Sequence, residues 1–148
     1  MNSKLKAIMD EYGVLQDYAK GDRLIHQGLP IEWFYILLEG SVKIEQNAPN
    51  GKSILLCFYH AGLRHTNTDN PTMEQGDVLF LGDLELYTRD KRANSTVTAV
   101  SSLRCCRISA AVVARHAAVD PQVSNCIAES LARKMDAYCR MSAINLLY

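Results

Sequence analysis

At 148 residues the chain has room for one domain with its own core, and its 16 Lys and Arg residues balance its 16 Asp and Glu residues. A chain without net charge lacks the overall field that attracts nucleic acid, so DNA binding would need a local basic patch or a further domain. The opening residues lack the apolar run of a signal peptide, no stretch is long and apolar enough to span a membrane, and the five cysteines show no regular spacing. We therefore expect a reduced protein in the cytoplasm, with no membrane partner.

The first half of the chain predicts one helix followed by short strands. Apolar residues three or four positions apart predict a helix over Ser3–Tyr12, closed by Gly13. Four β-type runs separated by turn residues follow, at Arg23–Gln27, Trp33–Leu38, Val42–Glu45 and Ser53–Tyr59. The dipeptide Asn50-Gly51 predicts a hairpin between the last two runs, because both residues tolerate positive φ.

The second half of the chain returns to strands after a polar segment around Asn67–Pro71. Strands are predicted at Asp77–Phe80, Thr96–Val100 and Leu103–Ile108. Cys105 and Cys106 lie in the last of these, so their side chains point to opposite faces, which predicts one core thiol and one surface thiol. Short strands at this spacing indicate a mainly β fold of the sandwich, jelly-roll or barrel type.

The C-terminal quarter of the chain predicts two helices. Ser109 caps a short helix that extends through His116. Asp120 followed by Pro121 predicts the start of a second helix of about 27 residues, roughly 40 Å long. Its apolar stripe predicts a seam that pairs with the same helix of a second copy in a parallel homodimer, through Ile127, Leu131, Tyr138 and Met141, joined by Met135.

Several glycine turns carry a resemblance to a known family. They lie in Lys20–Pro30, Trp33–Ile44, Asn50–Lys52 and Phe80–Leu86, with glycines at positions 21, 28, 40, 51 and 82. This pattern resembles the cyclic-nucleotide-binding fold, above all that of the bacterial Crp/Fnr transcription regulators. The resemblance implies a double-stranded β-helix (jelly-roll) sensor domain with an N-terminal helix over residues 1–120, then a dimerisation helix over residues 121–148.

The same resemblance places a phosphate-binding cassette after the sixth strand. In the family, a Gly-Glu turn presents backbone N–H groups to the cyclic phosphate, the acid holds the ribose 2′-hydroxyl, and a later arginine pairs with the phosphate. Here Gly82 and Asp83 stand in the glycine and acid positions, Ala93 stands in the arginine position, and Arg92 is one residue early. Glu85 adds a carboxylate beside the expected phosphate, which disfavours an anion.

We therefore expect a small-molecule effector in the barrel, with no bound cofactor and only weak binding of cyclic nucleotides. The predicted ligand-binding residues lie in the cassette, at the start of the next strand and on the long helix, and are Gly82, Asp83, Leu84, Glu85, Arg92, Ser95, Thr96 and Tyr138. No nucleophile motif is present, so we expect neither catalytic nor metal-binding residues.

Crp/Fnr-type regulators normally carry a helix-turn-helix domain after the long helix. Because this sequence stops at Tyr148, we expect a fragment of a longer protein that binds DNA only through a domain absent from this chain, in preference to a free-standing sensor. Two alternatives stay open. One is a small cupin-like enzyme that uses a metal near His60, His65, Asp69 and Glu74. The other is a cyclic-nucleotide-binding module that regulates another protein.

Overall fold

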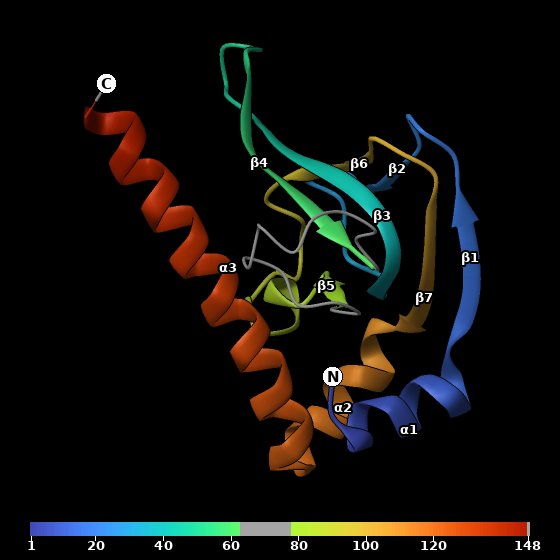
Figure 1. Cartoon of the computed structure of the whole chain (residues 1–148). Helices are drawn as coiled ribbons and strands as arrows, with labels where there is room; N and C mark the ends of the chain where they lie inside the picture. The colour runs from blue at the N-terminus through green and yellow to red at the C-terminus, as the bar shows by residue number, and fades with distance from the viewer. Residues whose placement is uncertain (63–77, 148) are drawn as a thin grey trace, which may run out of the picture.

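The computed structural model describes residues 1–62 and 78–147, with side chains as far as Arg140. Helix α1 (Ser3–Tyr12) is followed by an antiparallel β-barrel, and helices α2 (Ala110–Val119) and α3 (Pro121–Leu147) complete the chain (Figure 1). The strands of the described residues are β1 (Val14–Tyr18), β2 (Arg23–Ile25), β3 (Trp33–Asn47), β4 (Ser53–Ala61), β5 (Leu79–Leu81), β6 (Thr96–Ala99) and β7 (Leu103–Ser109). A one-turn 3₁₀ helix, η1 (Leu84–Leu86), follows β5. The predicted fold class, mainly β with flanking helices, is confirmed.

Strand β3 organises the barrel, because it pairs with four other strands. Its first half pairs with β5 and β7, and its second half pairs with β4 and β6, all antiparallel. The sequence predicts two strands here with a turn at Gly40, and that prediction is wrong. Gly40 has a φ of +113°, and a Cβ there would come within 2.5 Å of the Leu103 side chain and of the Ser102 carbonyl oxygen. The glycine therefore lets β3 pass close to β7 without ending.

Strand β1 is absent from the sequence prediction. It pairs along β7 from Val14 opposite Arg107 to Tyr18 opposite Leu103. Val14 and Leu15 are both exposed, so this strand lacks the alternation of buried and exposed residues by which a strand is recognised in a sequence. β1 lies at the edge of the strand order, next to β7.

The hairpin predicted at Asn50-Gly51 is confirmed, with a longer turn than the dipeptide suggests. It joins β3 to β4, with Asn47 opposite Ser53. The Ala48 N–H donates to the Lys52 carbonyl oxygen over 2.8 Å, so the connection spans residues 48–52. Only Gly51 has a positive φ, of +83°, and the Asn50 side chain instead accepts from the Lys52 N–H.

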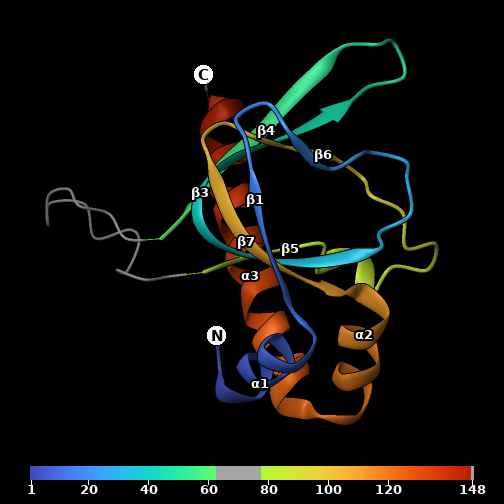
Figure 2. The same cartoon turned by 90° about the vertical axis from the view of Figure 1, so that its right-hand side faces the viewer.

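Two hydrophobic clusters lie on either side of β7. One fills the barrel and includes Leu37, Val42 and Cys105, and the other lies between the barrel and the helices and includes Phe34, Ile36 and Cys106. Figure 2 shows α1, α2 and the first turns of α3 gathered at one end of the barrel. Both thiols of the Cys105-Cys106 pair are therefore buried, which corrects the prediction of one surface thiol.

Helix α3 starts at Pro121, as the sequence predicts. The Asp120 side chain accepts from the Gln122 N–H over 3.0 Å, and its carbonyl oxygen accepts from the N–H groups of Val123 and Ser124. Helix α2 runs three residues past His116, to Val119. Helix α3 passes along the side of the barrel and beyond it (Figure 1). No helix in the described residues is both long and apolar enough to cross a membrane.

Candidate ligand-binding site

A cavity of about 350 Å³ lies between the β5–η1 turn, the start of β6, the β3–β4 hairpin and α3. Six of the predicted ligand-binding residues line it, namely Gly82, Asp83, Leu84, Glu85, Ser95 and Tyr138. The remaining wall is mostly apolar, with Ile25, Ile44, Leu56, Leu81, Val97, Leu131 and Met135. These residues come from seven separate elements and share one concave surface, which is the usual setting of a small-molecule site.

Two other predicted ligand-binding residues do not line this cavity. The Thr96 hydroxyl oxygen accepts a hydrogen bond from the Gln27 N–H over 3.1 Å. The exposed Arg92 guanidinium donates to the Gly28 carbonyl oxygen over 3.0 Å and lies in a neighbouring depression that also contains Ala93. The Arg92 guanidinium therefore makes its hydrogen bond outside this cavity.

Gly82 fixes the turn that begins the cassette. Its φ is +80°, and a Cβ at this position would lie 2.7 Å from the carbonyl oxygen of Trp33. Glycine is therefore required twice, once for the left-handed backbone and once for the close approach of β3. Because the Gly82 turn packs against β3, this contact determines the position of Asp83 and η1 at the cavity.

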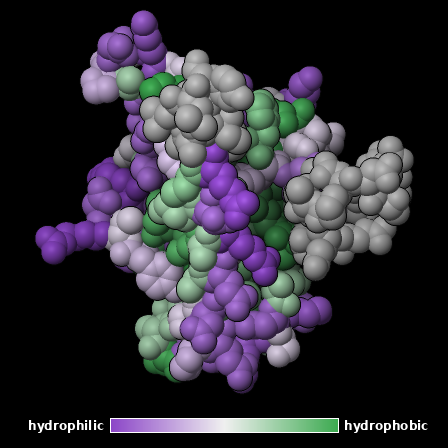
Figure 3. Space-filling view, turned by 60° about the vertical axis from the view of Figure 1, so that its left-hand side comes forward, coloured by the Kyte–Doolittle hydropathy of each residue, from purple (hydrophilic) through white to green (hydrophobic). Residues whose placement is uncertain are grey.

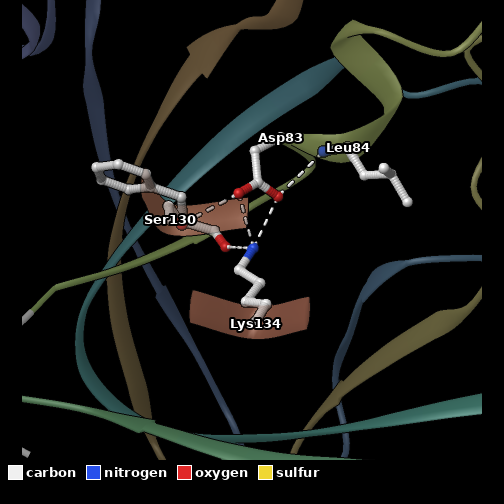
Figure 4. Close-up of polar contacts among 5 residues, drawn as sticks. Asp83, Leu84, Ser130 and Lys134 are labelled. Atoms are coloured by element: carbon white, nitrogen blue, oxygen red, sulfur yellow. Dashed lines mark hydrogen bonds and ion pairs between the residues drawn. The ribbon is translucent and has the colours of Figure 1, made fainter. Parts of the chain in front are cut away.

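Asp83 forms a buried ion pair with Lys134 of α3 (Figure 4). The Lys134 Nζ lies 2.7 Å from the Oδ1 atom and 2.8 Å from the Oδ2 atom of Asp83. It also donates to the Phe80 carbonyl oxygen. Sequence reasoning missed Lys134, although it lies three residues after Leu131 and therefore on the same face of the helix.

The Asp83 carboxylate has no hydrogen-bonding capacity left for a ligand. Besides the two contacts from Lys134, its Oδ1 accepts from the Leu84 N–H over 3.1 Å and its Oδ2 accepts from the Ser130 hydroxyl over 3.2 Å. A carboxylate accepts about four hydrogen bonds, and these four all come from the protein. The Leu84 N–H, which the family resemblance would direct at a phosphate, is also taken.

Glu85 is the second acid of the cassette and is only 7% exposed. Burial raises the pKa of its carboxyl above the ordinary value, and the nearby negative charge of Asp83 raises it further. Both effects favour the uncharged form. The polar end of the cavity therefore consists of the Asp83–Lys134 ion pair, whose hydrogen bonds are made within the protein, and of Glu85, whose raised pKa disfavours ionisation.

A metal-binding enzyme site receives no support from the described residues. Within residues 1–62 and 78–147, no group of three or more His, Cys, Asp or Glu side chains is arranged to hold a metal ion. The His60 ring contacts the Ser41 hydroxyl over 2.6 Å. The other residues of the cupin alternative, His65, Asp69 and Glu74, lie outside the described residues.

Comparisons with known proteins agree with this geometry. Residues 15–63 match the family model of the cyclic nucleotide-binding domain. No curated relative matches the chain by sequence. A transcriptional regulator from Thermotoga maritima is similar over 100% of both chains, with 20% identity and a TM-score of 0.68. The c-di-GMP-responsive global regulator CLP from Xanthomonas campestris is similar over 96% of this chain and 63% of its own, with 13% identity and a TM-score of 0.72.

The sensor domain of the transcriptional regulator DNR from Pseudomonas aeruginosa is also similar, over 93% of this chain and 80% of its own. Its identity is 18% and its TM-score is 0.63. This chain therefore spans most of an isolated sensor domain but under two thirds of CLP. The predicted resemblance is confirmed at the level of the fold: the chain has the cyclic-nucleotide-binding jelly-roll fold, which it shares with these transcription regulators.

Proposed function

We propose that this chain is the effector-sensing and dimerisation domain of a Crp/Fnr-type transcription regulator, with a small molecule bound in the cavity under α3. The observation that carries the proposal is that α3 forms one wall of the cavity and is joined to the cassette through Lys134 and Asp83. A ligand in this cavity contacts the barrel and the helix together. Its binding therefore changes how firmly α3 is held.

The proteins that share this fold support a regulatory function for the chain. CLP is described as a c-di-GMP-responsive regulator, and the DNR fragment is described as a sensor domain. We infer a domain of the same general type here, acting in the cytoplasm and without catalytic activity. We further infer that DNA is contacted by a separate domain, because the chain matches only 63% of the length of CLP.

The dimer seam that we propose differs from the one predicted from the sequence. Ile127 is completely buried in the core between the helices and the barrel, so it has no surface to offer to a partner. Leu131 and Tyr138 line the cavity, and Met141 lies beyond the side chains that the structure describes. Of the predicted stripe, Ile127, Leu131 and Tyr138 thus contact or face the barrel of their own chain.

A neighbouring face of α3 carries a second stripe at heptad spacing, and its Met135 also lines the edge of the cavity. It consists of exposed residues three and four positions apart, namely Asn125, Ala128, Ala132, Met135 and Cys139. Small side chains at alternate positions allow two helices to approach closely. Figure 3 views the molecule from the side of α3, where hydrophobic surface flanks a hydrophilic strip that runs up the middle of the view. We therefore assign the parallel homodimer contact to this stripe.

Light scattering tests the dimer. The unaltered chain should give twice its 16.5 kDa mass at micromolar concentration. Ala132→Arg should convert the dimer to a monomer, because the two copies would bring two arginine side chains together in one seam. Ala137→Arg, on the same helix but outside the stripe, should leave the dimer intact. A monomeric unaltered chain, or equal effects of the two variants, would contradict the proposed seam.

Thermal shift against a library of small metabolites tests the sensing role. At least one chemical class should raise the Tm of the unaltered chain, because a ligand that binds only the folded state stabilises it. The same compounds should not raise the Tm of Ser95→Trp, in which an indole fills the cavity from the start of β6. Stabilisation that persists in this variant would place the ligand elsewhere and contradict the proposal.

A further inference from the structure

We propose that the effector is an uncharged, mainly apolar small molecule that presents one hydrogen-bonding group to the η1 end of the cavity. This inference rests on the proposed function, because it concerns the ligand of the same cavity. It is carried by the distribution of apolar and charged side chains around that cavity. It goes further than the weak cyclic-nucleotide binding expected from the sequence, because it names the chemistry that the site favours.

The walls of the cavity are apolar on several sides. Ile44 of β3, Leu56 of β4 and Val97 of β6 line the barrel side. Leu131 and Met135 line the α3 side. A cavity of about 350 Å³ falls within the usual range for small ligands, in which apolar walls supply most of the contact and a few polar groups set the orientation.

The charged lining residues leave no cation for an anionic ligand. Among the lining residues that the structure describes, the charged types are Asp83, Glu85 and Lys134. Lys134 has three N–H donors, and its three partners are the two Asp83 carboxylate oxygens and the Phe80 carbonyl oxygen. Its charge is therefore neutralised and its donors are occupied by the protein. An anion in this cavity would therefore meet no free positive group.

A cationic ligand is disfavoured for a different reason. The Asp83 carboxylate already accepts four hydrogen bonds within the protein. Glu85 is buried, and the shift in its pKa favours the uncharged carboxyl. A cation would leave water for apolar walls, where the Asp83 carboxylate is already paired with Lys134, and this is unfavourable. The Glu85 carboxyl and the hydroxyl of Ser95 can instead exchange hydrogen bonds with a neutral polar group.

Two fluorescent dyes of matched shape test this ligand class. N-phenyl-1-naphthylamine is uncharged, and 1-anilinonaphthalene-8-sulfonate has the same ring frame with an added sulfonate. We expect the neutral dye to bind the unaltered dimer at least about tenfold more tightly than the anionic dye. We also expect it to bind more tightly than N-(1-naphthyl)ethylenediamine, which carries a positive charge.

Two matched pairs of variants localise the binding. Ser95→Trp fills the cavity, and Ser53→Trp makes the same change on β4 outside it. Leu56→Trp narrows the cavity from β4, and Ile54→Trp makes the same change at an exposed position two residues earlier on that strand. The first member of each pair should weaken binding of the neutral dye at least about tenfold, and the second should not. The two pairs act from different strands, so misfolding of one blocking variant, seen by circular dichroism, leaves the test intact.

The outcomes separate the ligand class from the proposed function. If the anionic or the cationic dye binds as tightly as the neutral one and loses its binding in the cavity-filling variants, the ligand class is wrong and the effector cavity stands. If the cavity-filling variants do not weaken binding of any of the three dyes, the cavity is not a ligand site. That result would overturn both this inference and the proposed sensing role.

Discussion

The Lys134 ammonium of α3 lies within 2.8 Å of both carboxylate oxygens of Asp83 in the β5–η1 turn, 51 residues away along the chain. The family resemblance assigns this acid to the ribose of a nucleotide. In this protein it binds the helix instead. The pair is thus both a link between barrel and helix and the reason why the cassette offers no free carboxylate. Any effector that binds here does so beside a contact that already holds α3 in place.

Breaking this ion pair should strongly destabilise the fold. Lys134→Met leaves the buried Asp83 without its counter-charge, and removing one partner of a buried pair lowers the free energy of unfolding by about 3 kcal/mol or more. Arg140→Met is the control, because Arg140 pairs with Asp136 over 3.1 Å on the exposed surface of the same helix. Arg140→Met should lower the free energy of unfolding by at most about 0.5 kcal/mol. Urea denaturation measures both, and similar losses would show that the Asp83–Lys134 pair adds nothing beyond a surface contact.

Replacing Gly82 and replacing Gly28 distinguish two effects of an added Cβ, namely backbone strain at positive φ and a steric clash with a neighbouring strand. Both have positive φ, of +80° and +87°, but a Cβ at Gly82 would meet the Trp33 carbonyl oxygen and a Cβ at Gly28 would meet nothing within 4 Å. Gly28→Ala should therefore lower the free energy of unfolding by about 1 kcal/mol, the backbone cost alone. Gly82→Ala should lower it by at least about 1 kcal/mol more, because β3 must shift. Chemical denaturation of the two variants side by side gives the comparison. Equal losses would mean that β3 does not constrain the turn.

Elements with local signals could be predicted from the sequence. Asp120 and Pro121 set the start of α3 through contacts within one helical turn, and Asn50-Gly51 set the hairpin within five residues. The position of the cassette followed from the family resemblance, because the Gly82 turn keeps a recognisable spacing from the other glycine turns. These features depend on neighbours in the chain, which a sequence displays directly.

Features that depend on tertiary contacts could not be predicted in the same way. The burial of Ile127 against the barrel and the ion pair of Lys134 with Asp83 both arise only when α3 lies along the barrel. An apolar stripe on a helix does not state whether its own domain or a partner covers it. Gly40 likewise is a residue type that is frequent in turns. Only its close approach to Leu103 shows why a glycine lies here within a continuous strand.

The stability of the protein should depend on the ionisation of Glu85. The pKa of this carboxyl is raised in the folded state, chiefly by burial, so the unfolded state loses its proton first as the pH rises. Stability is therefore lost as the pH rises from the ordinary glutamate value through the raised folded value. Glu85→Gln removes this ionisation, so the Tm gain of this variant over the unaltered protein should grow as the pH rises above about 4, the ordinary glutamate value.

The matched control for this experiment is Glu11→Gln on α1, where the side chain is exposed. Its Tm difference from the unaltered protein should stay within about 1 °C across the same pH range, since surface substitutions have small effects. Differential scanning calorimetry at several pH values gives both curves. A Glu85→Gln gain that is constant with pH would show that Glu85 does not resist ionisation in the folded protein.

Cyclic AMP and cyclic GMP should bind no more tightly than a Kd of about 100 μM. The phosphate contact of an arginine contributes roughly 1.5–3 kcal/mol, and losing it weakens binding about ten- to a hundredfold. Here Ala93 stands in the arginine position, and its side chain is buried in the barrel core. The acid that would hold the ribose is saturated by Lys134, Ser130 and the Leu84 N–H. We therefore expect both of the polar contacts that the family resemblance implies to be missing here.

Isothermal titration calorimetry of the unaltered protein with each nucleotide measures this directly, and Arg92→Ala identifies any substitute for the missing arginine. Because the Arg92 guanidinium donates to the Gly28 carbonyl oxygen outside the cavity, its removal should leave the weak binding unchanged. Lys52→Ala, at an exposed position in the β3–β4 turn, is the control for loss of a distant positive charge. Micromolar binding that is lost in Arg92→Ala but kept in Lys52→Ala would show that Arg92 turns into the cavity when a nucleotide is present. The cassette would then be a working phosphate site with a displaced arginine.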